Sequence, residues 1–147
     1  MTALINPAAI VEITPSAGVR TALHGWRAKC LQRLIRMDLP VPTSFAISAD
    51  AVRAIAMGGT PDRARLAAII ERADGLVSVR PSAQNPAWGG PGTVLNVGIN
   101  AACHARLSET RGKPAADALY LGFVQSYAIH VARLDPDMFS DSDAGLD

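Results

Sequence analysis

The sequence predicts an α+β domain in which a small sheet is flanked by helices. Three observations lead to this fold class. The chain has 147 residues, of which 49% are hydrophobic and 18% charged, enough for one packed core and too apolar for intrinsic disorder. Apolar side chains recur at helical spacing in several segments. Short apolar runs bounded by proline and glycine lie between those segments and are typical of strands.

The first third of the chain contains two expected strands and one helix. A short apolar run over residues 9–13 is expected to form an edge strand that ends at a proline. Residues 22–37 have apolar side chains at helical spacing, and we expect the regular helix to begin near Gly25 and to stop before Pro40. A turn rich in proline then leads into a strand over residues 44–47.

Two helix-start signals follow. Ser48 is a suitable N-cap for a helix through Ala56, because its hydroxyl can accept a hydrogen bond from a free backbone N–H of the first turn. Thr60 is followed by proline and aspartate, which predicts that it caps a second helix continuing to Ala73.

The second half of the chain alternates extended and helical segments. Residues 76–80 form an expected strand, and residues 81–92 form a loop rich in glycine and proline, which we interpret as a mobile lid or binding loop. Residues 93–100 are apolar and extended, and two helices follow over residues 100–108, capped by an asparagine, and 114–134. The last helix has one apolar stripe, which either packs in the core or forms an interface: Tyr120, Val124, Tyr127 and Val131.

Charge is unevenly distributed along the chain. The net charge is +1, but the five aspartates of residues 135–147 leave 14 bases against eight acids over residues 1–134. We expect residues 1–134 to form a single domain and residues 135–147 to form a frayed acidic tail. A carboxylate metal site in this tail is the minor alternative.

Several classes of protein are excluded by these features. No apolar run approaches the roughly 18 residues of a membrane-spanning helix, and no basic side chain precedes Arg20, so neither a membrane protein nor a secretory signal is expected. Two cysteines, Cys30 and Cys103, are too few for a disulfide framework or a thiolate metal site. We therefore expect a cytoplasmic chain that binds no metal by itself, and no arrangement of side chains predicts a catalytic residue.

Two arginines are candidates for binding an anion. Arg27 falls beside apolar positions in the first turn of its helix, where the macrodipole disfavours a cation, so we expect an anion opposite it. Alternatively, its stem covers core surface while its head reaches solvent. By contrast, Lys29, Arg33 and Arg36 are expected on an ordinary solvated face. Arg80 closes a strand and opens the glycine-rich loop, where backbone N–H groups can bind phosphate, unless it is simply a surface arginine at a strand end.

Three blocks of the sequence have a family pattern. The first is "GWRAKCLQRLIRMD" followed by "LPVPTSFAIS", the second is "VSVRPSAQNPAWGGPGTVLNVGIN", and the third is "FVQSYAIHVARLDPDMF". They resemble the N-terminal ATP-grasp region of pyruvate, phosphate dikinase and the related phosphoenolpyruvate synthases. There the corresponding strings read roughly GGKGANLAEM and LPVPPGF, then VSVRSGA, a lid loop ending in PGMMD, and TVLNLGLN. The VSVR and TVLN blocks have the same spacing without gaps, and the resemblance covers most of residues 22–139.

The resemblance implies the first lobe of an ATP-grasp domain and a set of ATP-binding residues. Arg80 matches the family arginine that contacts the ATP phosphates. Arg27 occupies the position of the ATP-binding lysine, which keeps the charge but replaces a compact ammonium by a planar fork. Gly89 and Gly90 lie in the lid loop, where their backbone can cradle phosphate, and Thr93 matches the start of the next block.

Other features depart from the family. Gly92 stands where the family loop has an acid, and 147 residues do not accommodate the second lobe with its metal ligands, the phosphohistidine domain or the pyruvate-binding barrel. The resemblance therefore implies a phosphotransferase lobe that binds ATP without turnover by itself, and Mg²⁺ only where a partner chain supplies the second lobe. His104 superficially resembles the phosphohistidine, but it directly follows the TVLN block and is interpreted as an ordinary helix residue.

Two other function classes stay open. The departures at Arg27 and Gly92 favour a non-catalytic regulatory or protein-interaction module that keeps the fold. Residues 20–36 contain bases and no acids, as in nucleic-acid-binding segments, but few aromatic residues accompany them. In each case we expect a homodimer or a partner chain to cover the apolar stripe of the last helix.

Overall fold

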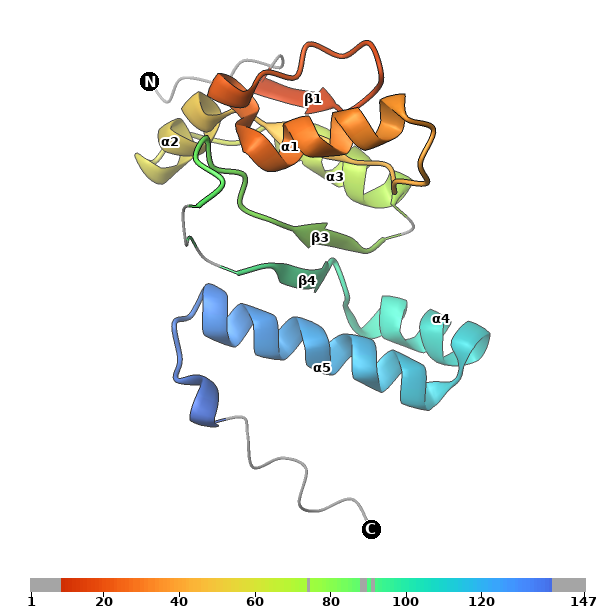
Figure 1. Ribbon diagram of the computed structural model, residues 1–147. Helices are drawn as coiled ribbons and strands as arrows, with labels where there is room; N and C mark the ends of the chain where they lie inside the picture. Colours follow the sequence, from red (N-terminus) through yellow and green to blue (C-terminus); the bar gives the residue numbers. More distant parts are fainter. Residues whose placement is uncertain (1–8, 74, 88–89, 91, 139–147) are drawn as a thin grey trace. The chain divides into compact units, whose positions relative to one another are not determined.

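The computed structural model describes residues 9–73, 75–87, 90 and 92–138. These residues contain five helices and two small antiparallel sheets, so the chain has an α+β fold, as the sequence predicts (Figure 1). The four strands form two separate pairs rather than the single small sheet that was expected.

Contacts between residues divide the chain into two compact units. Unit 1 comprises Met1–Ala68 and Pro81–Gly90, and unit 2 comprises Ile69–Arg80 and Pro91–Asp147. Helix α3 (Arg63–Arg72) contains the boundary between them. Each unit has its own strand pair and its own apolar cluster.

Unit 1 contains the first strand pair and two helices. Strand β1 (Ile10–Glu12) runs antiparallel to β2 (Phe45–Ile47), within the segments predicted to be extended. Helix α1 (Thr21–Arg36) contacts both β2 and helix α2 (Ala49–Ala56). The small apolar cluster of this unit consists of Ile13, Val19, Ala28 and Ala46, against which Ala17, Leu31 and Ile35 pack.

Side-chain caps set the starts of the two short helices that follow β2. At the start of α2, Ser48 Oγ accepts a hydrogen bond from Ala51 N (3.3 Å), which confirms the predicted cap. At the start of α3, Asp62 Oδ1 accepts one from Arg65 N (3.0 Å). The prediction that Thr60 caps α3 is therefore wrong, because the aspartate two residues later reaches the free N–H of the first turn.

One buried polar side chain holds the turn between β1 and α1. Gln32 has no exposed surface, and its Nε2 donates hydrogen bonds to the carbonyls of Thr14 (3.0 Å) and Ala17 (2.6 Å). Its Oε1 accepts a hydrogen bond from Lys29 Nζ (2.9 Å), and this ammonium also donates to the Val19 carbonyl (3.0 Å). Buried polar groups require hydrogen-bond partners, and two side chains of α1 thus supply them to backbone carbonyls of the turn.

Unit 2 contains the second strand pair and the last two helices. Strand β3 (Val77–Val79) runs antiparallel to β4 (Val94–Val97). Helix α5 (Lys113–His130) lies along β4, and helix α4 (Ala101–Arg111) packs on α5 (Figure 1). The apolar cluster consists of Ile99, Cys103, Leu107 and Ala116, together with the partly buried Leu76, Leu119 and Phe123.

The helix boundaries of unit 2 follow the predicted signals at their starts. Asn100 Oδ1 accepts a hydrogen bond from Cys103 N (2.9 Å) and caps α4, as predicted. This helix continues past Ser108 as far as the residue before Gly112, whose φ of 86° separates it from α5. Helix α5 ends before Leu134, four residues earlier than expected. None of the described helices is both long enough and apolar enough to span a membrane.

Candidate functional site

Residues 81–84, here called the strap, are hydrogen-bonded to the first turns of α1 within unit 1. Ser82 Oγ accepts a hydrogen bond from Ala28 N (3.1 Å). The Ala83 carbonyl accepts one from Trp26 N (2.7 Å). The first N–H groups of a helix have no partner within the helix. Here the strap accepts hydrogen bonds from two of them, although Ser82 and Ala28 are 54 residues apart in sequence.

Gly25 permits this close approach. Its backbone (φ 79°, ψ 172°) is not helical, so α1 bends there and its regular part begins after Gly25, as predicted. A Cβ at this position would lie 1.7 Å from the Ser82 carbonyl oxygen, so glycine alone fits. On the other side of the bend, Gln84 Nε2 donates a hydrogen bond to the Ala22 carbonyl (2.7 Å).

The strap corrects one prediction about the glycine-rich loop. Residues 81–92 were expected to form a mobile lid, but the first four of them are anchored by three hydrogen bonds. Gly90 is half-buried in unit 1, whereas Gly89, its predicted partner in a phosphate cradle, lies outside the described residues together with Trp88.

Three cations of α1 that were expected to be merely solvated have structural partners. Lys29 bonds the turn before α1, as described above. Arg36 Nε donates a hydrogen bond to the Pro15 carbonyl (2.7 Å), and the Arg33 guanidinium lies 5.3 Å from the ring centroid of Trp26. Guanidinium groups over indole rings are attracted by the negative face of the ring. Arg33 and Arg36 are exposed, as predicted for a solvated face, whereas Lys29 is half-buried and departs from that prediction.

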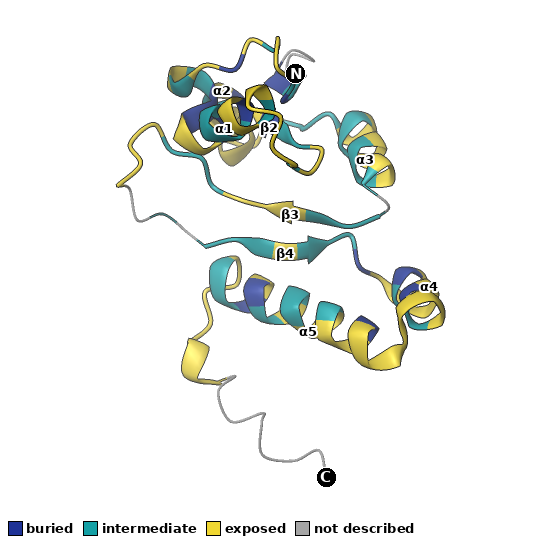
Figure 2. Cartoon of the chain, turned by 45° about the vertical axis from the view of Figure 1, so that its right-hand side comes forward, coloured by how far each residue is buried: buried dark blue, intermediate teal, exposed yellow. Residues whose placement is uncertain are grey.

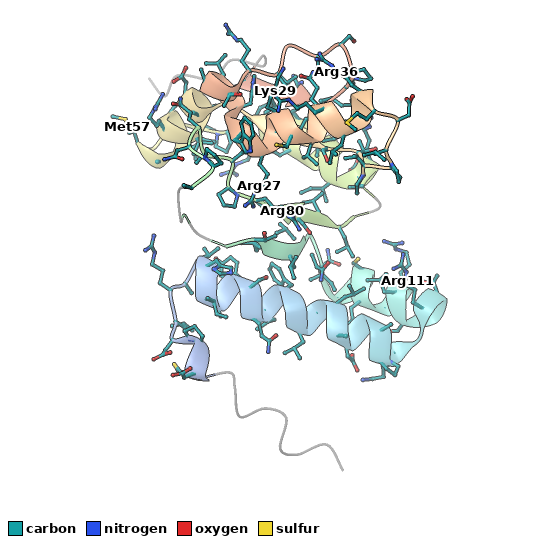
Figure 3. The ribbon with its side chains drawn as sticks, viewed as in Figure 1. Arg27, Lys29, Arg36, Met57, Arg80 and Arg111 are labelled. Carbon is teal, nitrogen blue, oxygen red and sulfur yellow. The ribbon has the colours of Figure 1, made fainter. Side chains whose placement is uncertain are left out.

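Arg27 behaves in the opposite way. It was expected on the apolar face of the helix, but it is exposed, because Ala28 and Gln32 form the buried face (Figure 3). Among the described residues, none forms a hydrogen bond or ion pair with the Arg27 guanidinium. A free cation in the first turn of a regular helix is destabilised by the macrodipole, and a bound anion would offset this cost.

Arg80 and Thr93 lie together in unit 2. The register of the strand pair places Val79 opposite Val94, so Arg80, which follows β3, and Thr93, which precedes β4, flank the same end of the pair. Arg80 is exposed, Thr93 is half-buried, and within the part of the chain that the structure describes Arg80 has no ion-pair partner. Two predicted site residues thus share one strand end.

His130 packs against this end of unit 2 and was not singled out from the sequence. A Cβ at Gly92 would lie 2.2 Å from both Cε1 and Nε2 of the His130 ring. The imidazole at the end of α5 therefore fills the space that a side chain at position 92 needs. The only sequence feature that pointed to this contact was Gly92, which stands where the resembling family has an acid. That feature does not identify His130 as the residue that fills the space.

A second histidine, His24, has surroundings that disfavour its charged form. His24 is buried, and its Nδ1 accepts a hydrogen bond from Arg20 N (3.1 Å). Loss of solvent around the ring lowers the pKa of His24 below its ordinary value of 6.5, so the ring is neutral at pH 7.

His104 belongs to a polar contact between α4 and α5. Its Nε2 lies 2.8 Å from Asp117 Oδ1, and Lys113 Nζ lies 2.6 Å from Asp117 Oδ2. The hydrogen bond from Lys113 first, and that from His104 second, lower the pKa of the Asp117 carboxyl below its ordinary value of 3.8. The three side chains link two helices.

Comparison with known proteins assigns no family. No family model matches this chain, and no curated protein matches it. Among the described residues, no three His, Cys, Asp or Glu side chains form a group that could hold a metal ion.

Proposed function

We propose that this chain binds the phosphates of ATP, with Arg27 and Arg80 as charged contacts and with the backbone of Gly89 and Gly90 and the side chain of Thr93 as further contacts. The strap supports this proposal. Its hydrogen bonds bring the segment that directly follows Arg80 to the segment that contains Arg27, although Ser82 and Ala28 are 54 residues apart in sequence. These are the two blocks in which the resembling dikinases bind ATP phosphates.

The chemistry of the α1 start favours guanidinium contacts over backbone contacts. The N–H groups of Trp26 and Ala28 already donate to the strap, so they are not available to a phosphate. Arg27 is exposed at the same turn, while Lys29 is occupied by the Val19 carbonyl and Gln32. A planar guanidinium can bind two phosphate oxygens at once, and each charge-assisted hydrogen bond contributes roughly 1.5–3 kcal/mol.

Calorimetric titration with ATP tests the proposal on the parent chain and on three variants. Arg27→Ala and Arg80→Ala should each weaken binding by about tenfold or more, the equivalent of one charge-assisted contact. Arg111→Ala removes an exposed arginine in the last turn of α4, is the matched control, and should bind as the parent does. A chain with Arg80→Ala that binds ATP as tightly as the parent would contradict the proposal.

Competing ligands separate ATP binding from other anion binding. Tripolyphosphate should compete with ATP and adenosine should compete poorly, because the proposed contacts are to phosphate. A generic oligonucleotide that binds more tightly than ATP, with a steep dependence on salt, would instead favour nucleic-acid binding through residues 20–36.

A second candidate function is a protein-interaction module, which the outer face of α5 favours. All four residues of the predicted apolar stripe are exposed there: Tyr120, Val124, Tyr127 and Val131. In this reading a second chain covers the stripe, and a partner that supplied an acidic second lobe would also bring the ligands for Mg²⁺.

We place either activity in the cytoplasm, because Cys30 and Cys103 are both free thiols and reducing compartments keep thiols in this form.

A further inference from the structure

Helix α1 carries an aromatic side chain on its exposed side. Ala28 and Gln32 belong to the buried side of this helix. Trp26, Arg27 and Arg33 lie on the exposed side (Figure 2). The backbone N–H of Trp26 is bonded to the strap, and the residue as a whole is 37% exposed. The strap therefore fixes the backbone of Trp26, while part of its indole ring is open to solvent.

A guanidinium holds the indole ring from one side. Residues 26 and 33 are seven positions apart, which is close to two helical turns, so they lie on one line along α1. The Arg33 guanidinium lies over the Trp26 ring, 5.3 Å from its centroid. An accessible aromatic ring with arginine beside it is the arrangement on which proteins stack the bases of nucleotides, because every base has a flat π-face.

The charge around Trp26 suits the phosphates that a nucleotide carries. Residues 13–37 contain five lysines or arginines and no acid. Among the residues that the structure describes, no carboxylate pairs with any of these five bases. Arg27, the proposed phosphate contact, directly follows Trp26 in sequence and is exposed at the same turn. One ligand can therefore contact the indole ring with its base and the guanidinium of Arg27 with its phosphates.

We propose that Trp26 stacks on the base of the nucleotide whose phosphates Arg27 binds, and that this site takes purine nucleoside triphosphates without distinguishing adenine from guanine. The inference rests on the proposed binding of phosphate. Stacking tolerates a change of base, and a purine covers more of an indole ring than a pyrimidine does.

The hydrogen bonds around Trp26 explain the lack of discrimination. The N–H groups of Trp26 and Ala28 donate to the strap, and Gln84 Nε2 donates to the Ala22 carbonyl. These groups are engaged within unit 1, so they do not read the edge of a base. A site that recognises a base edge needs hydrogen-bonding groups whose own partners are missing without the ligand.

Calorimetric titration with ATP, GTP, CTP and tripolyphosphate tests the stacking. The parent chain should bind ATP and GTP within about threefold of each other, CTP more weakly, and tripolyphosphate roughly tenfold more weakly than ATP. Trp26→Ala should lose this tenfold advantage of ATP and keep the affinity of the parent for tripolyphosphate. Trp26→Phe retains a smaller ring and should recover part of the loss. Tyr127→Ala removes an exposed ring in unit 2, is the matched control, and should bind as the parent does.

Fluorescence reports the stacking directly in a Trp88→Phe background, where Trp26 is the only tryptophan. ATP and GTP should quench its emission, because the base covers the indole, and tripolyphosphate should leave the emission nearly unchanged. A circular dichroism spectrum of each variant establishes that it is folded.

The outcomes separate the stacking from the phosphate binding on which it rests. Equal affinity of the parent for ATP and tripolyphosphate, or an unchanged ATP affinity in Trp26→Ala, would overturn the stacking and leave phosphate binding in place. A parent chain that prefers ATP over GTP by tenfold or more would overturn the tolerance of the base. A parent chain that binds neither ATP nor tripolyphosphate would overturn both proposals.

Discussion

The two units use their polar side chains at different places in the fold. In unit 1, polar side chains reach backbone groups: Gln32, Lys29 and Arg36 bond the turn before α1, and Ser82 and Gln84 bond the first turns of the helix. In unit 2, Ser126 of α5 accepts a hydrogen bond from Leu95 N of β4 (3.0 Å), and Asn96 of β4 donates one to the Leu119 carbonyl of α5 (2.9 Å), beside an apolar cluster around Leu107 and Ala116. Polar side chains of unit 1 thus hold a turn and the start of a helix, whereas those of unit 2 join a strand to a helix.

Each unit also has one glycine at which two backbone segments touch. A Cβ at Gly25 would meet the Ser82 carbonyl oxygen at 1.7 Å, and one at Gly98 (φ 108°) would meet the Gly75 carbonyl oxygen at 2.2 Å. Both units thus have a close contact between backbone segments that only glycine permits. Substitution of Gly25 therefore displaces the hydrogen-bonded strap, and the same change at Gly98 displaces the backbone at Gly75.

The largest effect is expected for Gly25→Ala. The new Cβ collides with backbone and cannot be accommodated at φ 79°, so the strap must leave α1, and the free energy of unfolding should fall by more than about 3 kcal/mol. Two alanine variants separate the causes in urea denaturation. Gly58 has a positive φ but no atom within 4 Å of the position that a Cβ would take, so Gly58→Ala should lower the free energy of unfolding by about 1 kcal/mol. Gly18 has neither a positive φ nor a close neighbour, so Gly18→Ala should change it little. A Gly25→Ala chain as stable as Gly58→Ala would show that the strap contributes nothing to stability.

A smaller but clear loss is expected for Gln32→Leu. Leucine keeps much of the volume but leaves the Thr14 and Ala17 carbonyls and the Lys29 ammonium without their partner, so the loss should be about 2–3 kcal/mol. Gln125→Leu makes the same chemical change at a half-buried position of α5 and should be close to neutral. Equal losses in the two variants would mean that the hydrogen bonds of Gln32 contribute nothing to stability.

The smallest effect is a difference in the pH dependence of the two units. Because burial lowers the pKa of His24, the unfolded chain binds a proton near pH 6.5 that the folded chain does not, and the free energy of unfolding falls as the pH drops below 6.5. Asp117 acts in the same direction at lower pH: its lowered pKa stabilises the fold above its ordinary value of 3.8, and this gain is lost as the pH falls through the lowered pKa.

The variant His24→Asn tests this difference, since its side-chain oxygen can still accept the hydrogen bond from Arg20 N. Denaturation midpoints at pH about 7.5 and about 5.5 should differ less in His24→Asn than in the parent, because the ring that resists protonation is gone. Gly18→Ala, which changes no titratable group and has open space around it, is the control, and it should keep the difference seen in the parent. An unchanged difference in His24→Asn would assign the pH dependence to other groups.

Local signals in the sequence predicted much of the secondary structure. Ser48 and Asn100 cap the helices that they were expected to cap, because a capping hydrogen bond involves only neighbours in sequence. The strand segments were also located, but their pairing into two sheets was not, since pairing depends on contacts distant in sequence. The same limit explains the error at α3, where Thr60 and Asp62 are both good caps and only the path of the chain selects one.

The candidate site was predictable in part for the same reason. The resemblance pointed to Arg27 and Arg80 by number, but helical periodicity placed Arg27 on the wrong face, because a small residue and a polar one, Ala28 and Gln32, form the buried face instead of the leucines. The roles of Lys29 and Arg36 depend on carbonyls of the preceding turn, whose position no periodicity gives. The contact between His104 and Asp117 likewise requires that α4 and α5 fold back on each other.

The packing of His130 on Gly92 couples these two positions. A Cβ introduced at position 92 meets the imidazole at 2.2 Å, so the His130 ring must turn away to admit it. A smaller residue at position 130 removes that requirement. The effect of a substitution at position 92 therefore depends on which residue stands at position 130.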